Sequence, residues 1–390
     1  MTALLSGNQV VLLETGDAFF PALAAAIDGA RRSVHLETYI FRHDRTADGI
    51  AGALASAARR GVEVRLLVDG FGSANLAPAL RRLLEPAGVE VRVFRPERER
   101  FRLRRDRLRQ LRRLHRKLCV IDEQIGFCGG INIQDDRDGV DTAAPRFDFA
   151  VRVEGPVVAD MVRAQRRLWR LVGWAAGRLP ETAMSAVPDG APLPGGVAAA
   201  FLVRDNLRYR RSIEDAYLTA IENANSEIVL CHAYFLPGRR FRRALREAVA
   251  RGVRVRLLLQ GKSEHFWMHY AMRALYGSMV DAGIEIHDYQ VGWLHAKVGV
   301  VDRRWATVGS SNLDPFSLLL AREGNIEIAD DGFAARLLAS LDLAMSARAV
   351  AVRPELWARR PLHERLLSWL AYGLARFALG VARAGWGQFL

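Results

Sequence analysis

Two copies of one polar motif contain the residues that are best suited to chemistry. The shared positions are His115, Lys117, Asp122, Gly130 and Asn132 in the first copy, and His295, Lys297, Asp302, Ser310 and Asn312 in the second. An imidazole has an ordinary pKa of about 6.5, so at neutral pH one histidine can be neutral while another is protonated. A neutral ring can attack phosphorus while a protonated ring donates to the departing alcohol. The paired motifs therefore predict exchange at a phosphodiester.

The other motif residues suit a bound phosphate. Lysine ammonium groups and asparagine amides can donate to the non-bridging oxygens, and one such donor typically contributes on the order of 10²- to 10³-fold in rate. The pair Gly129–Gly130 is expected to permit a tight turn that brings the backbone close to the phosphate, and Gly130 and the matching Ser310 are predicted substrate contacts. Asp122 and Asp302 are expected to orient the imidazoles as a carboxylate does in a catalytic triad, with a turn role at a strand end as the alternative.

Lysine is rare in this chain. Of 56 Lys and Arg residues, only Lys117, Lys262 and Lys297 are lysines, and two of these fall in the motifs. A compact ammonium contacts a phosphate oxygen differently from a guanidinium, so the remaining lysines are candidates for chemistry. Lys262 follows an apolar strand pattern, at the kind of strand end where α/β folds bind ligands. We expect it to be a secondary phosphate contact.

The sequence contains no GxxxxGK[ST] loop and no carboxylates clustered as metal ligands. Exchanging one phosphodiester for another needs no energy input, so we expect no nucleotide, metal or other cofactor. Cys119, Cys128 and Cys231 form no CxxC pair, which argues against structural zinc and suits a reducing compartment.

The motifs lie within a larger internal repeat. VHLETYIF at 34–41 matches IVLCHAYF at 228–235, and GVEVRLLVDG at 61–70 matches GVRVRLLLQG at 252–261. Helical patterns such as 49–60 alternate with these β-branched runs, as in strand-helix-strand units. We predict an α/β fold of two similar halves, each a mixed sheet flanked by helices, related by a pseudo-two-fold axis. Such an axis would bring both motifs to one site.

The repeat also suggests domain boundaries. The predicted segments are a first half at 1–177, a linker rich in Pro, Gly and Ala at 178–194, a second half at 195–350 and a C-terminal segment at 351–390. Within the last segment Leu366, Leu370, Leu374, Phe377 and Val381 recur at helical spacing, with arginines on the opposite face. This pattern predicts an amphipathic, membrane-associating helix, and a closing helix packed on its own domain is the alternative.

Charge favours an anionic partner. The formal net charge is +13 at pH 7, and the segment from Arg95 to Arg116 contains 11 arginines interleaved with apolar residues. This Arg-rich segment fits lipid headgroups, nucleic-acid phosphates or a solvated charge run. The C-terminal pattern favours lipid over nucleic acid, and an apolar stretch at 266–276 could flank a lipid entry or belong to the core. The sequence contains no uncharged run of eighteen or more apolar residues, so we expect peripheral membrane attachment and not a transmembrane helix. No Lys or Arg precedes Arg31, so we expect no cleaved signal peptide.

The motif HxKx4Dx6G[GS]xN, present twice in one chain, resembles the phospholipase D superfamily. LETYIF, AYFLPG and VGSSNLDPFSL resemble its shorter bacterial cardiolipin synthases, and the resemblance covers nearly the whole chain. It implies synthesis of cardiolipin and glycerol from two phosphatidylglycerol molecules through a phosphohistidine. The resemblance suggests His115 as nucleophile and His295 as general acid and then base, and the symmetry of the motifs leaves the reversed order open. It also places Asp148 and Glu323 at polar site positions, Glu323 as a substrate contact. Ala321 stands where the family has Asn.

The resemblance further implies phosphatidylglycerol and other anionic phospholipids as partners, and a peripheral position on the cytoplasmic face of the inner cell membrane. It does not predict an oligomeric state. A metal-independent phospholipase D or nuclease, with water as acceptor, is the alternative enzyme, and a basic binding protein without activity is the alternative class. Glu37 and His232, on the matching first strands, either face the site or make local hydrogen bonds.

Overall fold

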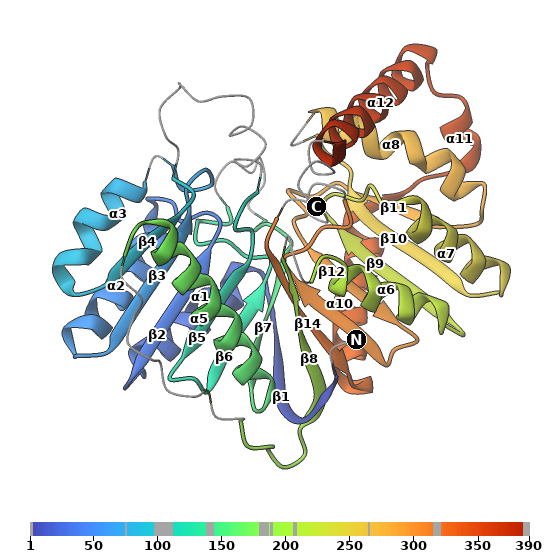
Figure 1. Cartoon of the computed structure of the whole chain (residues 1–390). Helices are drawn as coiled ribbons and strands as arrows, with labels where there is room; N and C mark the ends of the chain where they lie inside the picture. Colours follow the sequence, from blue (N-terminus) through green and yellow to red (C-terminus); the bar gives the residue numbers. More distant parts are fainter. Residues whose placement is uncertain are drawn as a thin grey trace.

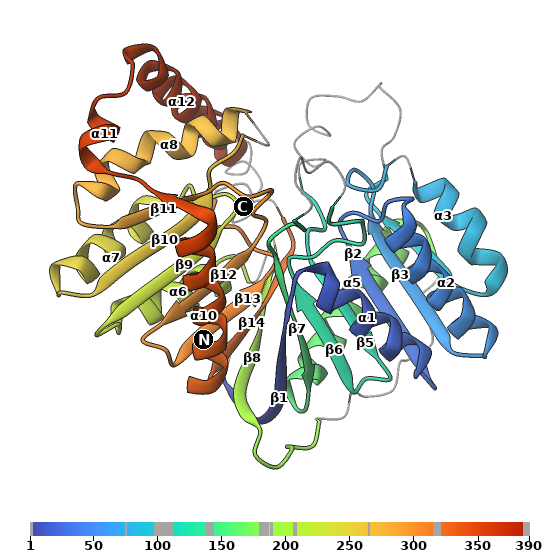
Figure 2. The same ribbon diagram turned by 180° about the vertical axis from the view of Figure 1, so that it is seen from behind.

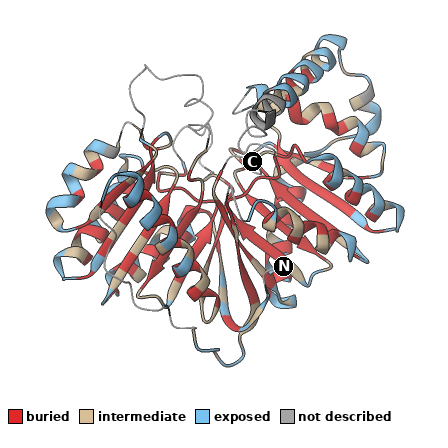
Figure 3. Ribbon diagram, in the orientation of Figure 1, coloured by how far each residue is buried: buried red, intermediate tan, exposed pale blue. Residues whose placement is uncertain are grey.

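The computed structural model describes residues 3–74, 76–96, 112–137, 144–178, 187, 190–205, 209–263, 266–314 and 321–384. Over these residues the chain forms a 15-stranded mixed sheet with helices on both faces (Figure 1). Figure 3 shows that the strands are largely buried and that the outer helix faces are exposed. The Arg-rich segment lies outside the described residues between 97 and 111.

The first half of the chain supplies seven strands of this sheet. They are β1 (Leu5–Glu14), β2 (Ser33–Thr38), β3 (Glu63–Asp69), β4 (Glu90–Phe94), β5 (Lys117–Ile121), β6 (Ile125–Gly129) and β7 (Phe149–Glu154). The helical elements with them are α1 (Thr15–Asp28), α2 (Arg45–Arg59), α3 (Ala77–Leu84), the short 3₁₀ turn η1 (Glu85–Ala87) and α5 (Val157–Ala175).

The second half supplies the other eight strands. They are β8 (Val197–Arg204), β9 (Glu227–His232), β10 (Arg254–Gln260), β11 (Glu285–Tyr289), β12 (Lys297–Val301), β13 (Trp305–Gly309), β14 (Glu323–Ala329) and β15 (Ala349–Ala351). The helices are α6 (Ser212–Glu222), α7 (Arg239–Ala250), α8 (Phe266–Val280), α10 (Asp331–Arg348), α11 (Pro354–Ala358) and α12 (Leu362–Ala384).

The strand order shows the duplication directly. It runs β15-β11-β10-β9-β12-β13-β14-β8-β1-β7-β6-β5-β2-β3-β4, so equivalent strands lie at matching positions on either side of the β8–β1 pair. In the first half β2, β3 and β4 pair in parallel, and in the second half β9, β10 and β11 do so. The motif strands β5 and β12 pair antiparallel with β6 and β13. Helix α5 faces the viewer in Figure 1 and its counterpart α10 faces the viewer in Figure 2, as a two-fold axis requires. The predicted α/β fold of two similar halves is confirmed.

The two half-sheets join into one through an irregular seam. Strand β1 pairs antiparallel with β8 at Leu5↔Ala199 and Asn8↔Val197, and the register shifts between these positions. The buried Asn8 side chain also accepts a hydrogen bond from the Val157 N–H at 2.9 Å, at the start of α5. The seam therefore links a strand contact between the halves to a helix end of the first half.

The largest apolar contact region lies between the halves. One cluster combines residues of β5, such as Leu118 and Val120, with residues of β12, such as Val298 and Val300. Two further clusters lie under the outer helices of each half. Because apolar burial provides the main stabilising free energy, the motif strands are positioned by a core to which both halves contribute.

The repeated glycines after two equivalent helices explain how each half reproduces the same turn. Gly61 follows α2 and Gly252 follows α7, and both have a φ of 88°. This left-handed conformation is inexpensive only for glycine, and it redirects the chain from the helix into the next strand.

Candidate active site

The two motif histidines lie at the starts of β5 and β12, and each is held there by backbone of the opposite half. The His115 N–H donates to the Arg322 carbonyl at 3.0 Å, beside an isolated bridge between Leu114 and Arg322. The His295 N–H donates to the Phe147 carbonyl at 2.9 Å in the same way. The motif segments therefore meet at the junction between the halves.

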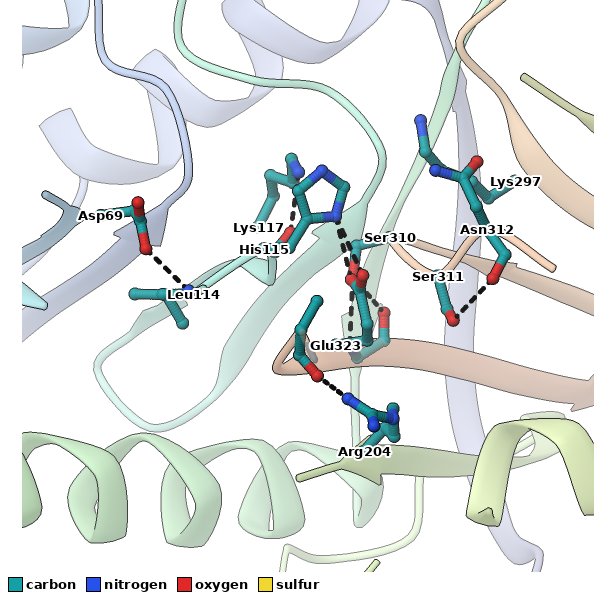
Figure 4. A network of polar contacts seen from close by, with 12 residues as sticks. Asp69, Leu114, His115, Lys117, Arg204, Lys297, Ser310, Ser311, Asn312 and Glu323 are labelled. Atoms are coloured by element: carbon teal, nitrogen blue, oxygen red, sulfur yellow. Dashed lines mark hydrogen bonds and ion pairs between the residues drawn. The ribbon is translucent and has the colours of Figure 1, made fainter. Parts of the chain in front are cut away.

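Each imidazole is also held by a carboxylate of the opposite half. His115 Nδ1 lies 3.0 and 3.1 Å from the two Glu323 carboxylate oxygens (Figure 4). His295 Nδ1 lies 2.6 Å from Asp148 Oδ2. A carboxylate at Nδ1 favours the tautomer with the proton on that nitrogen, which leaves the Nε2 lone pair available to a reacting group.

The two motif lysines are almost fully buried beside the histidines. Lys117 is 5% exposed and Lys297 is 0% exposed, and each Nζ donates to the carbonyl of the histidine in its own motif. Lys297 Nζ also lies 3.9 Å from Asp148 Oδ2. Burial and the neighbouring Lys297 ammonium lower the pKa of Lys117 to about 7. The two motifs thus share one electrostatic environment.

Burial controls the charge of the imidazoles. Desolvation lowers the pKa of His115, although Glu323 opposes this change. Desolvation and the Lys297 ammonium lower the pKa of His295 to about 4. Burial alone would raise the pKa of Asp148, but Lys297 and His295 hold it below its ordinary value. An anionic phosphodiester bound between the rings would favour protonation of one of them.

A family comparison accords with this geometry. The family described as cardiolipin synthase, PLD-like domain, matches residues 23–164 and 217–343. The chain belongs to this family. Cardiolipin synthase B of Salmonella typhi is 41% identical over 327 residues, covering 84% of this chain and 78% of that protein. Cardiolipin synthase B of Escherichia coli K12 is 38% identical with the same coverage.

The fold is shared more widely. Phosphatidylserine synthase of Haemophilus influenzae Rd KW20 superimposes with a TM-score of 0.70 at 14% identity, covering 97% of this chain and 96% of that one. The resemblance indicated by the two motifs is confirmed, and the chain is a phospholipase D-like enzyme with one motif in each matched segment.

The expected role of the motif aspartates needs correction. The Asp122 carboxylate accepts hydrogen bonds from the backbone N–H groups of Arg31, Arg32 and Ser33, and Asp302 accepts those of 225–227. Asp lies five positions after Lys in each motif, which corresponds to roughly 16 Å of strand at about 3.3 Å per residue. The aspartates therefore anchor the far end of the motif strands, and the contacts to the imidazoles come from the opposite half.

The predicted substrate contacts fall into two groups. Glu323 holds His115 and is fully buried, and Ser310 Oγ donates to Glu323 Oε2 at 2.5 Å, so both support the imidazole. The Gly130 N–H bonds to the Phe149 carbonyl, and an added Cβ there would lie 2.2 Å from Asp148 Oδ1. Glycine at position 130 therefore makes room for the Asp148 carboxylate, which holds His295. The prediction that the Gly130 backbone contacts the phosphate is corrected accordingly.

The two asparagines remain candidates for binding phosphate. Asn132 and Asn312 are 5% and 4% exposed. Asn132 Oδ1 accepts from the Ile40 N–H at 3.3 Å, and its amide NH₂ remains a candidate donor to a ligand. Asn312 Oδ1 is buried and has no hydrogen-bond partner among the described residues, and Asn312 lies near Lys297 in Figure 4.

Three other candidates lie away from the imidazoles. Lys262 is partly exposed just beyond β10, and its phosphate contact stays a prediction. Glu37 is fully buried and pairs with Arg116 at 2.6 Å, so it makes a local ion pair. His232 is fully buried, with its Nε2 3.4 Å from the Tyr217 hydroxyl.

Two site residues lie outside the paired motifs: Tyr39 falls within the LETYIF segment but was not singled out there, and Arg204 lies in no segment that the sequence marked. The Tyr39 ring lies 4.9 Å from the His115 ring, centroid to centroid, and burial raises the pKa of this tyrosine to about 12. In Figure 4, Arg204 lies below Glu323, on the side away from His115. Neither residue belongs to a motif, and only the fold brings them to the site. Within the described ranges, no group of three or more His, Cys, Asp and Glu residues could hold a metal ion.

Proposed function

We propose that this protein is a cardiolipin synthase that transfers a phosphatidyl group between two phosphatidylglycerol molecules and releases glycerol. The observation that supports it is the reciprocal site. Each imidazole has its Nδ1 on a carboxylate of the other half, and both motif lysines are buried beside them. The curated relatives of the same family carry the name cardiolipin synthase B.

The proposed reaction consists of two displacements. Nε2 of neutral His115 attacks phosphorus, a P–N bond forms, the P–O bond to glycerol breaks, and protonated His295 donates its proton to the glycerol oxygen. In the second step, His295 removes the proton from the headgroup hydroxyl of another phosphatidylglycerol. That oxygen attacks phosphorus, the P–N bond breaks, and both imidazoles return to their starting state.

The protein groups around phosphorus would act electrostatically. Lys117, Lys297 and the two asparagine amides would donate to the non-bridging oxygens as negative charge develops there. Glu323 and Asp148 would keep each ring oriented and stabilise it when protonated. With water as the acceptor, the same intermediate would give phosphatidic acid, which makes hydrolysis the competing outcome.

The test uses vesicles of phosphatidylglycerol in the presence of EDTA, followed by lipid separation. Cardiolipin plus glycerol is expected from the wild type. His115→Asn and His295→Asn should each lower turnover by several orders of magnitude, whereas His43→Asn, at an exposed surface position, should not. Phosphatidic acid alone would make the enzyme a phospholipase, and nucleic-acid cleavage without lipid turnover would make it a nuclease.

We further propose that the enzyme associates peripherally with a membrane through α12. This helix packs along α8 with small or polar residues, among them the buried Ser368 and Ala371. Its large apolar residues face outward, with Leu366, Leu370 and Phe377 at 62%, 54% and 71% exposure. This outward apolar face supports a lipid occupant, because interfacial helices place such a face at the acyl boundary.

The exposed face of α12 also lies at the same ends of the strands as the candidate active site. Helix α8 starts with Phe266 and Trp267, 50% and 57% exposed, directly after the carboxyl end of β10. His295 precedes β12, which runs antiparallel to β9 next to β10, so it lies at the same edge. Figures 1 and 2 both show α12 beside α8 at this edge. No described helix is both long and apolar enough to cross a bilayer. The Arg-rich segment stays part of this proposal, and its residues 97–111 lie outside the described ones.

Paired leucine variants test this surface. Leu370→Glu should lower binding to phosphatidylglycerol vesicles by about 10-fold or more, since an apolar contact worth roughly 2 kcal/mol is lost. Leu343→Glu, on α10 and 60% exposed, is the matched control and should bind as wild type does. Equal vesicle binding by both variants would refute the surface, and loss of a dimer with unchanged vesicle binding would make it a subunit contact.

A further inference from the structure

We propose that Arg204 is a positioning residue that holds Glu323, and through it the His115 imidazole, in the catalytic geometry. This inference rests on the proposed phosphodiester chemistry of the site, and it concerns the first motif only. The influence of Arg204 would pass through the segment that ends in Glu323.

The position of Arg204 follows from the sheet. It is the last residue of β8, and its Cα partner in β14 is Glu323. The side chain is 1% exposed, which is unusual for arginine, and its Nη1 donates to the Ala321 carbonyl (Figure 4). Position 321 therefore contributes its backbone oxygen, which an alanine provides as well as an asparagine would.

Charge gives Arg204 a second function. Glu323 is fully buried, and its contacts with His115 and Ser310 leave a negative charge that needs a cation nearby. Burial lowers the pKa of Arg204 to about 10, and the attraction of Glu323 limits this decrease. The guanidinium therefore stays protonated at neutral pH and places a positive charge beside the buried Glu323 segment.

The other half solves the same problem differently. Strand β1 pairs Glu14 with Phe149, so the residue opposite Asp148 is Thr15, whose N–H donates to the Asp148 carbonyl at 2.8 Å. The cation near the Asp148 carboxylate is Lys297, at 3.9 Å. Loss of Arg204 should thus weaken the support of His115 and leave the support of His295 in place.

Removal of Arg204 has a defined electrostatic sign. The charged groups that act on Arg204 are Glu323, Asp205, Arg322 and Asp314, and those that act on His115 are Glu323, Lys117 and Lys297. Without the guanidinium, a positive charge behind the Glu323–His115 contact is lost and protonation of His115 becomes easier. The acid limb of the activity profile, which requires neutral His115, should therefore move to higher pH, while the alkaline limb, which requires protonated His295, should stay in place. A residue that only supported the fold would lower the amount of active enzyme without moving the limbs.

The experiment compares Arg204→Met, Arg204→Lys and Arg256→Met. Arg256 is a suitable control because it is also buried and paired, with Asp342 and Glu227 at 2.6 and 2.7 Å, on β10. Arg204→Met should lower kcat by about 10-fold or more, with little change in KM. It should also move the acid limb of the pH profile up by on the order of one unit, and the pH optimum should rise with it. Arg204→Lys should keep the optimum because it keeps the charge, and Arg256→Met should keep it even where thermal unfolding shows lower stability.

The assay uses both phosphatidylglycerol vesicles and the soluble diester bis(4-nitrophenyl) phosphate. If wild-type enzyme cleaves the soluble diester but forms no cardiolipin, the proposed function fails and the pH comparison still tests Arg204. An Arg204→Met profile that superimposes on wild type would overturn the role of Arg204, as would an equal displacement in Arg256→Met.

Discussion

Single side chains in this site depend on residues far away in the sequence. His115 is oriented by Glu323 and His295 by Asp148, and both contacts cross between the halves. The motif aspartates make no such contact and instead accept backbone N–H groups near the strand ends. Catalytic and anchoring carboxylates can therefore be separated by substitution.

Glu323→Gln should mainly lower the catalytic rate, whereas Asp122→Ala should mainly lower the stability of the fold. Glu323→Gln should reduce kcat by about 10²- to 10⁴-fold, as expected when the partner of a catalytic imidazole is lost. Asp122→Ala should leave kcat within a few-fold of wild type but lower the free energy of unfolding by about 1–3 kcal/mol, because three backbone N–H groups lose their acceptor. Kinetics and urea unfolding of both variants measure the two effects, and a catalytic defect in Asp122→Ala as large as that of Glu323→Gln would contradict the assignment.

Lys117 should make anion binding dependent on pH. Its pKa of about 7 means that the empty site loses positive charge as pH rises through neutrality. Sulfate, whose charge is constant in this range, should bind several-fold more weakly at pH 8.5 than at pH 6, as measured by calorimetry. Lys117→Arg should lose this dependence because a guanidinium stays protonated. The same pH dependence in both proteins would assign it to another group.

The sequence singled out the histidines and lysines because their spacing recurs within a duplication, and the fold brings both motifs to the junction between the halves. It could not assign the aspartates, because the length of the intervening strand decides which sheet edge they reach. Arg204 could not be predicted at all, since its effect depends on the pairing of β8 with β14. Contacts between halves leave no local pattern in either half.

At the scale of elements, the two motif strands β5 and β12 differ in the side chains that precede them and pack against the neighbouring strand. Arg116, between the motif histidine and lysine, forms a buried ion pair with Glu37 of β2. The matching positions in the second half are Ala296 and Cys231, both buried and uncharged. One half thus places charges where the other places apolar side chains.

A double-mutant cycle on this ion pair should show strong coupling. Arg116→Met should lower the free energy of unfolding by about 3–5 kcal/mol because it leaves a buried carboxylate alone. Adding Glu37→Met should restore much of this stability, since both charges are then absent. Urea unfolding of the two single variants and the double variant measures the coupling, and additive losses would show that the charges act independently.

Helix α12 shows what periodicity can and cannot predict. Spacing alone predicted an amphipathic helix from Leu362 onward, and the structure has that helix. Periodicity did not reveal that small side chains would contact α8 while the large ones face outward. Which face packs depends on how closely two backbones approach, and small residues permit the closest approach.

For the whole molecule, buried histidines should determine stability in acid. Burial lowers the pKa of His232 to about 3 and lowers those of His269 and His295 to about 4, whereas the unfolded chain binds protons at about 6.5. Between these values the unfolded state binds more protons, so the free energy of unfolding should fall as pH decreases from about 6.5 to 4. Urea unfolding at several pH values measures this slope.

Replacement of one such histidine gives the control. His232→Gln should flatten the pH dependence, while His43→Gln at the surface should keep the slope of wild type. A slope that is unchanged in His232→Gln would show that other groups cause the loss of stability in acid.

The overall α/β duplication was predictable because its repeats are local sequence patterns. The continuous sheet through β1 and β8 was not, because it depends on an irregular strand pairing that no sequence pattern marks.

The exchange of carboxylates between the halves also has an evolutionary consequence. Once each copy relied on its neighbour for the partner of its own histidine, neither copy could be deleted or replaced alone without disabling the other. A hybrid that joins the first half of this chain to the second half of a distant relative inherits activity only if the junction restores both crossed contacts. Selection must therefore maintain both crossed histidine–carboxylate contacts together.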